Sequence, residues 1–153
     1  METTGAAQPA RIAVVSGYFN PLHVGHLRMM VEARGLGDRL IVIVNNDEQQ
    51  VAKMGRIIVP LADRMEIVAA LAVVDEVIPS VDEDTSVSAT LGLVRERYPN
   101  AELVFANGGD RSHPETVTEL PTCERLGIEI VLGVGGAEKA DASSRINRAL
   151  GLI

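Results

Sequence analysis

Five short apolar runs, separated by segments of helical pattern, constrain the fold of this chain more than any other feature. Most of the runs are continuous β-branched and aliphatic stretches without alternation, which is typical of strands covered on both faces. The runs are Arg11–Ser16, Leu40–Asn45, Glu76–Pro79, Glu102–Ala106 and Ile128–Gly133. Apolar residues at helical spacing predict helices at Val24–Arg34, Leu61–Val73, Ser86–Arg97, Glu115–Leu126 and Ser143–Leu150. This alternation predicts an α/β fold with a Rossmann-like, doubly wound sheet of five parallel strands.

The composition is that of one globular domain. The chain has 153 residues, of which 46% are apolar and 23% are charged, and these values are ordinary for a single folded domain. We expect a flexible N-terminal tail over residues 1–9 and one domain over residues 10–153. The apolar runs are too short to cross a bilayer, and the first residues lack the pattern of a signal peptide. We therefore expect a cytoplasmic protein without a membrane partner.

Charge and cysteine content exclude further classes of protein. The formal net charge is −7, whereas binding along a nucleic-acid backbone requires a basic surface. Nucleic acid is therefore not expected as a partner. The single cysteine, Cys123, cannot form an internal disulfide and is predicted to fill a helix face. Small anions remain as ligands for local sites.

The stretch GYFNPLHVGHL, Gly17 to Leu27, joins the first predicted strand to the first predicted helix. Ligands of doubly wound sheets bind beyond the carboxyl ends of the strands, where loops run into helix N-termini. His23 and His26 lie three residues apart at the positive end of this helix, and Gly25 between them leaves no side chain to block a ligand. An imidazole there can donate a hydrogen bond to a phosphate oxygen and stabilise its charge.

Alternative interpretations of the histidines and of other motifs are less favoured. A zinc site needs further ligands, and the remaining His113 and Cys123 lack ligand spacing. The histidines could merely cap and pack the helix, but the glycine and Asn-Pro residues around them favour a ligand site. In GVGGAE, Glu138 replaces the third glycine of a dinucleotide fingerprint, and no GxxxxGK[ST] loop occurs. A dinucleotide dehydrogenase and a P-loop enzyme are therefore not expected.

The stretch GYFNPLHVGHL resembles the GxFDxxHxGH signature of the nucleotidyltransferase superfamily. The segment Asn46 to Ser80 is similar to the glycerol-3-phosphate cytidylyltransferases and to the cytidylyltransferase domain of the ADP-heptose pathway enzyme. Lys53, in a polar stretch expected to be a loop, falls on a lysine of that family, and Arg64 on the arginine that opens its next helix. FANGGDR, from Phe105, and SSRI, from Ser143, match its later motifs in the same order.

The resemblance implies transfer of CMP from CTP to a small phosphorylated or phosphonate acceptor, with release of pyrophosphate and with Mg²⁺ accompanying the nucleotide. By the family pattern, the catalytic residues are His23, His26, Lys53 and Arg64. The nucleotide-binding residues are Gly17, Tyr18, Phe19, Asn20, Gly25, His26, Gly108, Asp110, Ser143 and Ser144. The acceptor-binding residues are Lys53, Arg64, Asn107 and Arg111, and Asp110 is the candidate magnesium ligand. A homodimer is expected from the resemblance and from the apolar stretch Met65–Val74.

Several positions depart from the family pattern. Asn20 replaces the commonest aspartate of the signature. Ala137 stands where the family has an arginine for the triphosphate or base, and Lys139 or Arg145 could substitute for it. Asn107 and Arg111 differ from the residues usual on the acceptor side, which favours an acceptor other than glycerol phosphate or heptose phosphate. Two alternatives stay open: an adenylyltransferase of the same superfamily, which uses ATP, and a nucleotide-binding module without catalysis.

Overall fold

The computed structural model describes residues 10–108, 114–135 and 143–152. The expected tail over residues 1–9 lies outside the described residues. The five strands are β1 (Arg11–Gly17), β2 (Arg39–Val44), β3 (Glu76–Pro79), β4 (Glu102–Gly108) and β5 (Ile128–Val134). The α-helices are α1 (Val24–Arg34), α2 (Asp47–Met54), α3 (Leu61–Ala69), α4 (Ser88–Arg97), α5 (Leu120–Leu126) and α6 (Ser143–Ala149), and a 3₁₀ turn, η2, spans Pro114–Thr116.

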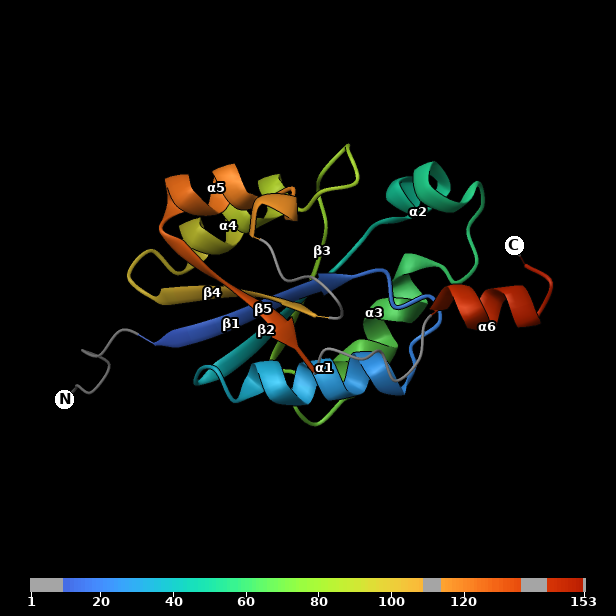
Figure 1. The fold of residues 1–153 in the computed structure, drawn as a ribbon, viewed down its shortest axis with the longest axis horizontal. Coiled ribbons are helices and arrows are strands. Elements are labelled where there is room, and N and C mark those ends of the chain that lie inside the picture. The colour runs from blue at the N-terminus through green and yellow to red at the C-terminus, as the bar shows by residue number, and fades with distance from the viewer. Residues whose placement is uncertain (1–9, 109–113, 136–142, 153) are drawn as a thin grey trace.

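The strands form one parallel sheet in the order β3-β2-β1-β4-β5. Helices α4 and α5 cover one face of the sheet, and α1 and α3 cover the other (Figure 1). Since β1 is central, the chain moves outward through β2 and β3 and then returns to the opposite side for β4 and β5. The predicted α/β fold with a doubly wound, five-stranded parallel sheet is confirmed.

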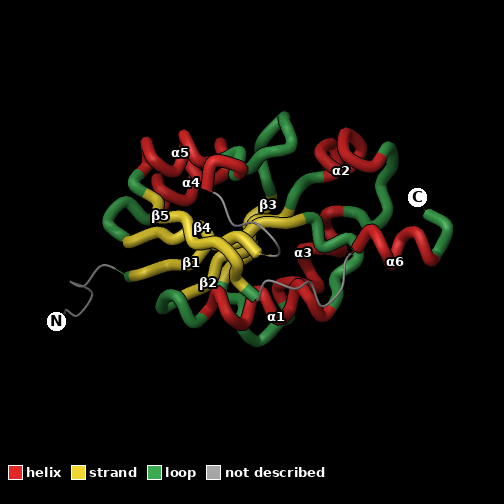
Figure 2. Tube along the Cα trace, viewed as in Figure 1, coloured by secondary structure: helices red, strands yellow, loops and turns green. Residues whose placement is uncertain are grey.

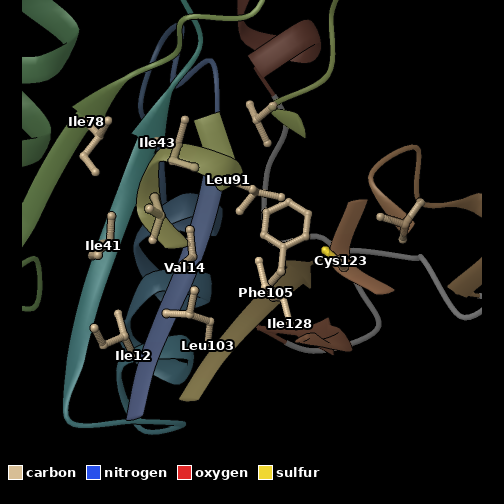
Figure 3. Packing of buried hydrophobic residues seen from close by; sticks show 13 residues of the cluster. Ile12, Val14, Ile41, Ile43, Ile78, Leu91, Leu103, Phe105, Cys123 and Ile128 are labelled. Carbon is tan, nitrogen blue, oxygen red and sulfur yellow. The ribbon is translucent and has the colours of Figure 1, made fainter. Parts of the chain in front are cut away.

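Each face of the sheet carries its own apolar cluster. Alternate residues of β1 separate the two clusters, because Ile12 and Val14 point to the α4/α5 side while Ala13 and Val15 point to the α1/α3 side. Figure 3 shows the first cluster, in which Phe105 lies among the aliphatic side chains beneath Leu91. Burial on both faces explains why the strands lack polar alternation in the sequence.

The strands differ from the predicted ones only at their ends, and the larger differences lie in the helices, of which α3 ends at Ala69 and not at Val73. The helix Val24–Arg34 is confirmed with its bounds, whereas α2 was not predicted, so Lys53 lies on a helix and not in a loop. The predicted helix Glu115–Leu126 is wrong in its first half, where η2 and a turn precede α5. Val117 in that turn is buried and contributes to the first apolar cluster, so its apolar character reflects packing without a helix.

The apolar stretch Met65–Val74 has an internal explanation. Val68 is buried, and Met65, Leu71, Val73 and Val74 pack against the α1/α3-side cluster. Internal packing therefore explains most of this stretch, although Ile67 is 50% exposed, and the homodimer stays a prediction. None of the helices in the described part of the chain is long and apolar enough to cross a membrane. The cytoplasmic location stays a prediction.

The carboxyl ends of the strands gather the loops that were predicted to bind a ligand. The β1–α1 turn lies at the point where the strand order reverses, between β2 and β4, which is the usual ligand crevice of such sheets. Helices α2 and α6 lie beyond this end of the sheet, beside the β1–α1 turn, as Figure 2 also shows.

Candidate active site

His23 and His26 form a capped and stacked pair at the N-terminus of α1. His23 is the N-cap, and its Nδ1 accepts a hydrogen bond from the backbone N–H of Gly25 at 3.0 Å. The Nδ1 of His26 accepts from the backbone N–H of His23 at 3.3 Å. The ring centroids are 3.8 Å apart and the ring planes differ by 23°. The two imidazoles thus serve as a reciprocal capping box for the helix, with histidines in the places of the usual Ser and Glu.

The capping bonds fix the tautomer of both rings. Since each Nδ1 uses its lone pair to accept a backbone N–H, the proton of each neutral ring resides on Nε2. Burial lowers the pKa of His26 to about 4, and the nearby His23 adds to this effect. At neutral pH His26 is therefore uncharged and can donate a hydrogen bond from Nε2.

The turn before the histidines is shaped by a glycine and an aromatic ring. Phe19 has a φ of 51°, in the left-handed region that side chains rarely adopt. This conformation folds its ring back over Gly17, where a Cβ would lie only 2.8 Å from the ring. The same ring meets His26 edge-on, with centroids 4.9 Å apart. Gly17 and Phe19, predicted to bind nucleotide, thus have a structural part in holding His26.

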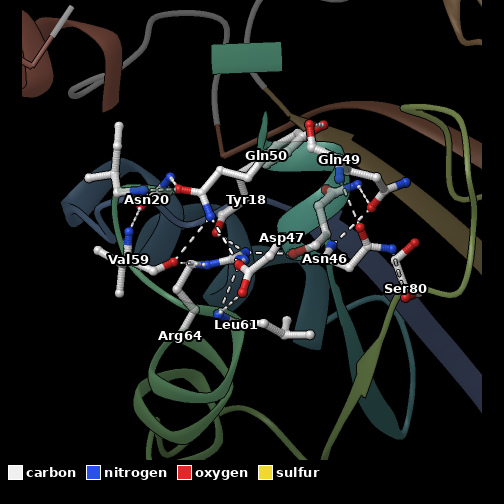
Figure 4. Close-up of polar contacts among 12 residues, drawn as sticks. Tyr18, Asn20, Asn46, Asp47, Gln49, Gln50, Val59, Leu61, Arg64 and Ser80 are labelled. Carbon is white, nitrogen blue, oxygen red and sulfur yellow. Dashed lines mark hydrogen bonds and ion pairs between the residues drawn. The ribbon is translucent and has the colours of Figure 1, made fainter. Parts of the chain in front are cut away.

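Arg64 on α3 is 1% exposed and donates to protein groups. Its Nε donates to the carbonyl of Val59 at 2.7 Å, and its Nη1 donates to the carbonyls of Tyr18 and Asn45 at 3.0 and 2.6 Å. Its Nη2 forms an ion pair with Asp47 Oδ1 at 2.8 Å. Four of the five guanidinium N–H groups are therefore used within the protein, and the arginine joins the ends of β1 and β2 to α2 and α3 (Figure 4).

Asn20 continues this buried polar network. Its Nδ2 donates to Gln50 Oε1, and its Oδ1 accepts from the backbone N–H of Val59 at 3.0 Å. Gln50 Oε1 also accepts from the backbone N–H of Ile58, while Gln50 Nε2 donates to Asp47 and Val59. Asn20 and Gln50 are both fully buried. The amide of Asn20 therefore ties the motif to α2 and to the segment before α3 (Figure 4).

Helix α6 is held against the same turn. Ser143 Oγ donates to the carbonyl of Pro21 at 2.9 Å, and Asn147 Nδ2 donates to the carbonyl of Asn20 at 3.0 Å. Asn147 is 1% exposed, and within the described part of the chain its Oδ1 has no hydrogen-bond partner. The structure thus brings Ser143, predicted to bind nucleotide, to the histidine turn, while Ser144 and Arg145 are exposed on α6.

Lys53 lies over the ring of Tyr18. The Nζ atom is 4.5 Å from the ring centroid, a cation–π distance. The Tyr18 hydroxyl donates to the carbonyl of Gln49 at 3.5 Å. Burial raises the pKa of Tyr18, and the charge of Arg64 opposes this rise, so the hydroxyl remains protonated at neutral pH.

The ends of β4 and β5 approach α1 closely. A Cβ on Gly108 would lie 2.8 Å from the sulfur of Met29 and 2.9 Å from the carbonyl oxygen of Val134, so glycine is needed for this approach. Asn107, beside it, carries a buried Nδ2 that has no hydrogen-bond partner among the described residues. Four further residues named from the sequence lie outside the described residues: Asp110, Arg111, Ala137 and Lys139.

The described residues do not form a metal site by themselves. No group of three or more His, Cys, Asp or Glu side chains in ranges 10–108, 114–135 and 143–152 is arranged to hold a metal ion. Magnesium with the nucleotide stays a prediction.

Sequence reasoning missed Asp47, Gln49, Gln50 and Asn147. Gln49 is buried, and its Oε1 accepts from Asn45 and Asn46 while its Nε2 donates to the carbonyls of Asp84 and Ser86. One signal was available, because Asn46 and Gln49 have the spacing of a capping box and Gly55 ends the helix in the left-handed conformation. The burial of Gln50 and Asn147 has no such local signal.

A parallel α/β sheet with a capped pair of imidazoles at a helix N-terminus on its switch point is an arrangement typical of proteins that bind phosphate groups. Residues 14–141 match the Cytidylyltransferase-like family. The chain belongs to this family, and the resemblance found in the sequence is confirmed.

Relatives and solved structures agree with this assignment. The chain is 37% identical to the bifunctional protein HldE of an Enterobacter species over 113 residues, covering 65% of this chain and 24% of the relative. It is 34% identical to HldE of Halorhodospira halophila over 140 residues, covering 89% and 28%. The chain thus spans about a quarter of the length of these relatives. A lipopolysaccharide core biosynthesis protein from Thermoplasma volcanium shares the fold, with a TM-score of 0.62, 22% identity, and coverage of 86% of this chain and 99% of that one.

Proposed function

We propose that this protein transfers a nucleotidyl group from CTP to a small phosphorylated or phosphonate acceptor, releasing pyrophosphate. One observation supports the proposal most strongly: both imidazoles at the start of α1 have Nδ1 occupied by backbone N–H groups. In the neutral form of each ring the proton lies on Nε2, and we assign these N–H groups, at the positive end of a helix, to the nucleotide. Such donors suit the oxygens of a triphosphate and the charge that develops on them.

The reaction needs no strong general base. An oxygen of the acceptor phosphate attacks the α-phosphorus, a new P–O bond forms, and the bond between the α-phosphorus and the oxygen bridging to the β-phosphorus breaks. The electron pair of that bond leaves with pyrophosphate. Because the second pKa of a phosphate monoester is about 6, the attacking oxygen is already ionised at neutral pH. Positioning and charge stabilisation then account for catalysis.

The histidines have different parts in this proposal. His26 donates from Nε2 to an α-phosphate oxygen, where negative charge grows in the transition state. His23 donates further along the triphosphate and contributes more to binding. Gly25, Gly108, Ser143 and Ser144 border the space for the nucleotide.

The two cations also differ. Lys53 is exposed on α2, and we assign it to the acceptor phosphate, with Asn107 and Arg111 on the same side. Arg64 donates to three carbonyls and one carboxylate, so we assign it a positioning part in place of direct phosphate contact. Asn20 is assigned the same part. Asp110 remains the candidate ligand for Mg²⁺, which would neutralise charge on the triphosphate when bound.

Two features of the proposal rest on the resemblance alone. The choice of CTP comes from the likeness to glycerol-3-phosphate cytidylyltransferases, while the likeness to the ADP-heptose pathway enzyme and to HldE proteins favours ATP as the second candidate. The homodimer is the other feature. Sedimentation at micromolar concentration tests it, and a monomer would remove it.

A nucleotide panel tests the proposal. CTP, ATP, GTP and UTP, each with Mg²⁺, are compared for the rise they cause in melting temperature, since a ligand of the folded state stabilises it. Pyrophosphate release is then measured with the best nucleotide and a panel of phosphorylated alcohols, sugar phosphates and phosphonates. We expect release only with CTP and an acceptor together. If pyrophosphate is released with ATP as the only accepted nucleotide, ATP replaces CTP in the proposal. If a nucleotide binds and no pyrophosphate is released, the protein is a nucleotide-binding module.

A further inference from the structure

Aromatic side chains are scarce in this chain, and two of them are adjacent at the site. The chain has two tyrosines, two phenylalanines and no tryptophan. Tyr18 and Phe19 are consecutive in the turn that follows β1. The ring of Phe19 meets His26 with centroids 4.9 Å apart, and the ring of Tyr18 lies 4.5 Å below the ammonium group of Lys53. Each aromatic ring thus contacts one of the groups assigned to substrate phosphates.

The Tyr18 ring is a fixed support. Its backbone carbonyl accepts a hydrogen bond from Arg64 Nη1 at 3.0 Å, and its hydroxyl reaches the carbonyl of Gln49. Arg64 and Gln49 are both buried. The buried contact of the Tyr18 carbonyl with Arg64 fixes the backbone that carries the ring, and the face of the ring offers the Lys53 ammonium group a favoured position.

We propose that Tyr18 is a positioning residue that holds the ammonium group of Lys53 ready for the dianionic phosphate of the acceptor. The inference deepens the proposed function and rests on it. The ring lowers the entropy that Lys53 loses on binding phosphate, and it keeps the cation beside the turn that carries the histidines. The π-face supplies this effect, so a phenylalanine in place of Tyr18 retains it and an aliphatic residue does not.

A second cation–π contact in the chain provides a matched control. Arg39 lies 5.6 Å from the ring centroid of Tyr98, whose hydroxyl donates to Glu76 Oε1 at 2.6 Å. Arg39 begins β2, at the end of the strand opposite the site. Tyr98→Leu therefore removes a tyrosine of similar kind without touching the histidine turn.

The test compares Tyr18→Leu, Tyr18→Phe and Tyr98→Leu in the full chain. The side-chain protons next to Lys53 Nζ are observed by NMR, and inorganic phosphate is titrated as the probe. We expect ring-current shifts of these protons in the wild type, in Tyr18→Phe and in Tyr98→Leu, and their loss in Tyr18→Leu. Phosphate affinity falls about two- to fivefold in Tyr18→Leu alone, the range of an exposed cation–π contact. When Lys53→Met is added to the wild type and to Tyr18→Leu, the two proteins should bind phosphate equally.

Steady-state kinetics give the second readout once an acceptor is known. Tyr18→Leu should raise KM for the acceptor by the same factor, whereas Tyr18→Phe and Tyr98→Leu should leave that KM close to the wild-type value. Equal phosphate affinity in the wild type and Tyr18→Leu, or an equal loss in Tyr18→Phe, would overturn the inference. Absence of nucleotidyl transfer with the NMR and phosphate results intact would instead contradict the proposed function, so the two failures are distinguishable.

Discussion

The two halves of the stretch from Gly17 to Leu27 use their polar groups in opposite ways. In the first half, Asn20 and the carbonyl of Tyr18 are tied inward to Gln50 and Arg64. In the second half, His23 and His26 accept the capping hydrogen bonds through Nδ1, and the proposed function assigns their Nε2–H groups to the nucleotide. Under that proposal, a signature that looks uniform in the sequence is half support and half binding site. Variants in the two halves should separate stability from catalysis.

Arg64→Met is expected to give the largest effect, and on stability. It leaves the carbonyls of Tyr18, Asn45 and Val59 without their donor and Asp47 without its ion pair. Asp47 is 34% exposed and can be hydrated, so most of the loss comes from the unpaired carbonyls, and each buried polar group left without a partner costs about 1–3 kcal/mol. Chemical denaturation measures the loss, with the exposed Arg56→Met as the control that stays within about 0.5 kcal/mol. Unchanged stability would remove Arg64 from the support half.

His26→Ala is expected to act on catalysis. Loss of one donor to developing charge lowers kcat about a hundredfold, equivalent to about 2.7 kcal/mol, with a smaller change in KM. The ring also caps α1 and packs on Phe19, so unfolding should become easier by about 1 kcal/mol. Melting temperature and rate are measured on one preparation, beside Glu32→Ala on the exposed face of α1. A normal kcat per folded molecule would contradict the proposed part of His26.

The pH dependence of stability should carry the signature of His26. The unfolded chain takes up this proton near pH 6.5 and the folded protein only near pH 4, so the free energy of unfolding falls as the pH is lowered through this window. The His26 contribution lost by pH 5 is about 2 kcal/mol. Urea unfolding of the wild type and His26→Ala from pH 7.5 to 4.5 measures it. Parallel curves for the two proteins would rule out a lowered pKa at His26.

Asn20→Asp should give the smallest effect of the four. The new carboxylate oxygen faces Gln50 Oε1, which already accepts from the backbone N–H of Ile58. Two acceptors then face each other in a buried place, at a cost of about 1–2 kcal/mol. Asn100→Asp makes the same chemical change at an exposed turn and should be neutral. A stabilising Asn20→Asp would show that the partner of Asn20 is not Gln50.

The sheet was predictable because its signal is local. A strand buried on both faces must be apolar throughout, and the runs around Val14 and Ile41 satisfy that rule in the sequence itself. The start of α1 was predictable for the same reason. Helix α2 was missed because its residues are polar, although the Asn46–Gln49 capping box marks its start.

The inward half of the site was not predictable from local pattern. In the sequence, Arg64 has the pattern of a surface residue on an amphipathic helix. The carbonyls that accept from its guanidinium belong to Tyr18 and Asn45, which follow β1 and β2. The buried amides of Gln50 and Asn147 depend in the same way on segments distant in the sequence. Local periodicity carries no information about such partners.

The contacts of helix α6 also bear on when the histidine turn can become ordered during synthesis. Ser143 and Asn147 hold the carbonyls of Pro21 and Asn20, more than a hundred residues earlier in the chain. A ribosome-bound chain that has already emerged through β4 can assemble the centre of its sheet, but its histidine turn still lacks these two clamps. We therefore expect the first motif to be translated to be among the last to become fully ordered, once α6 has docked against it.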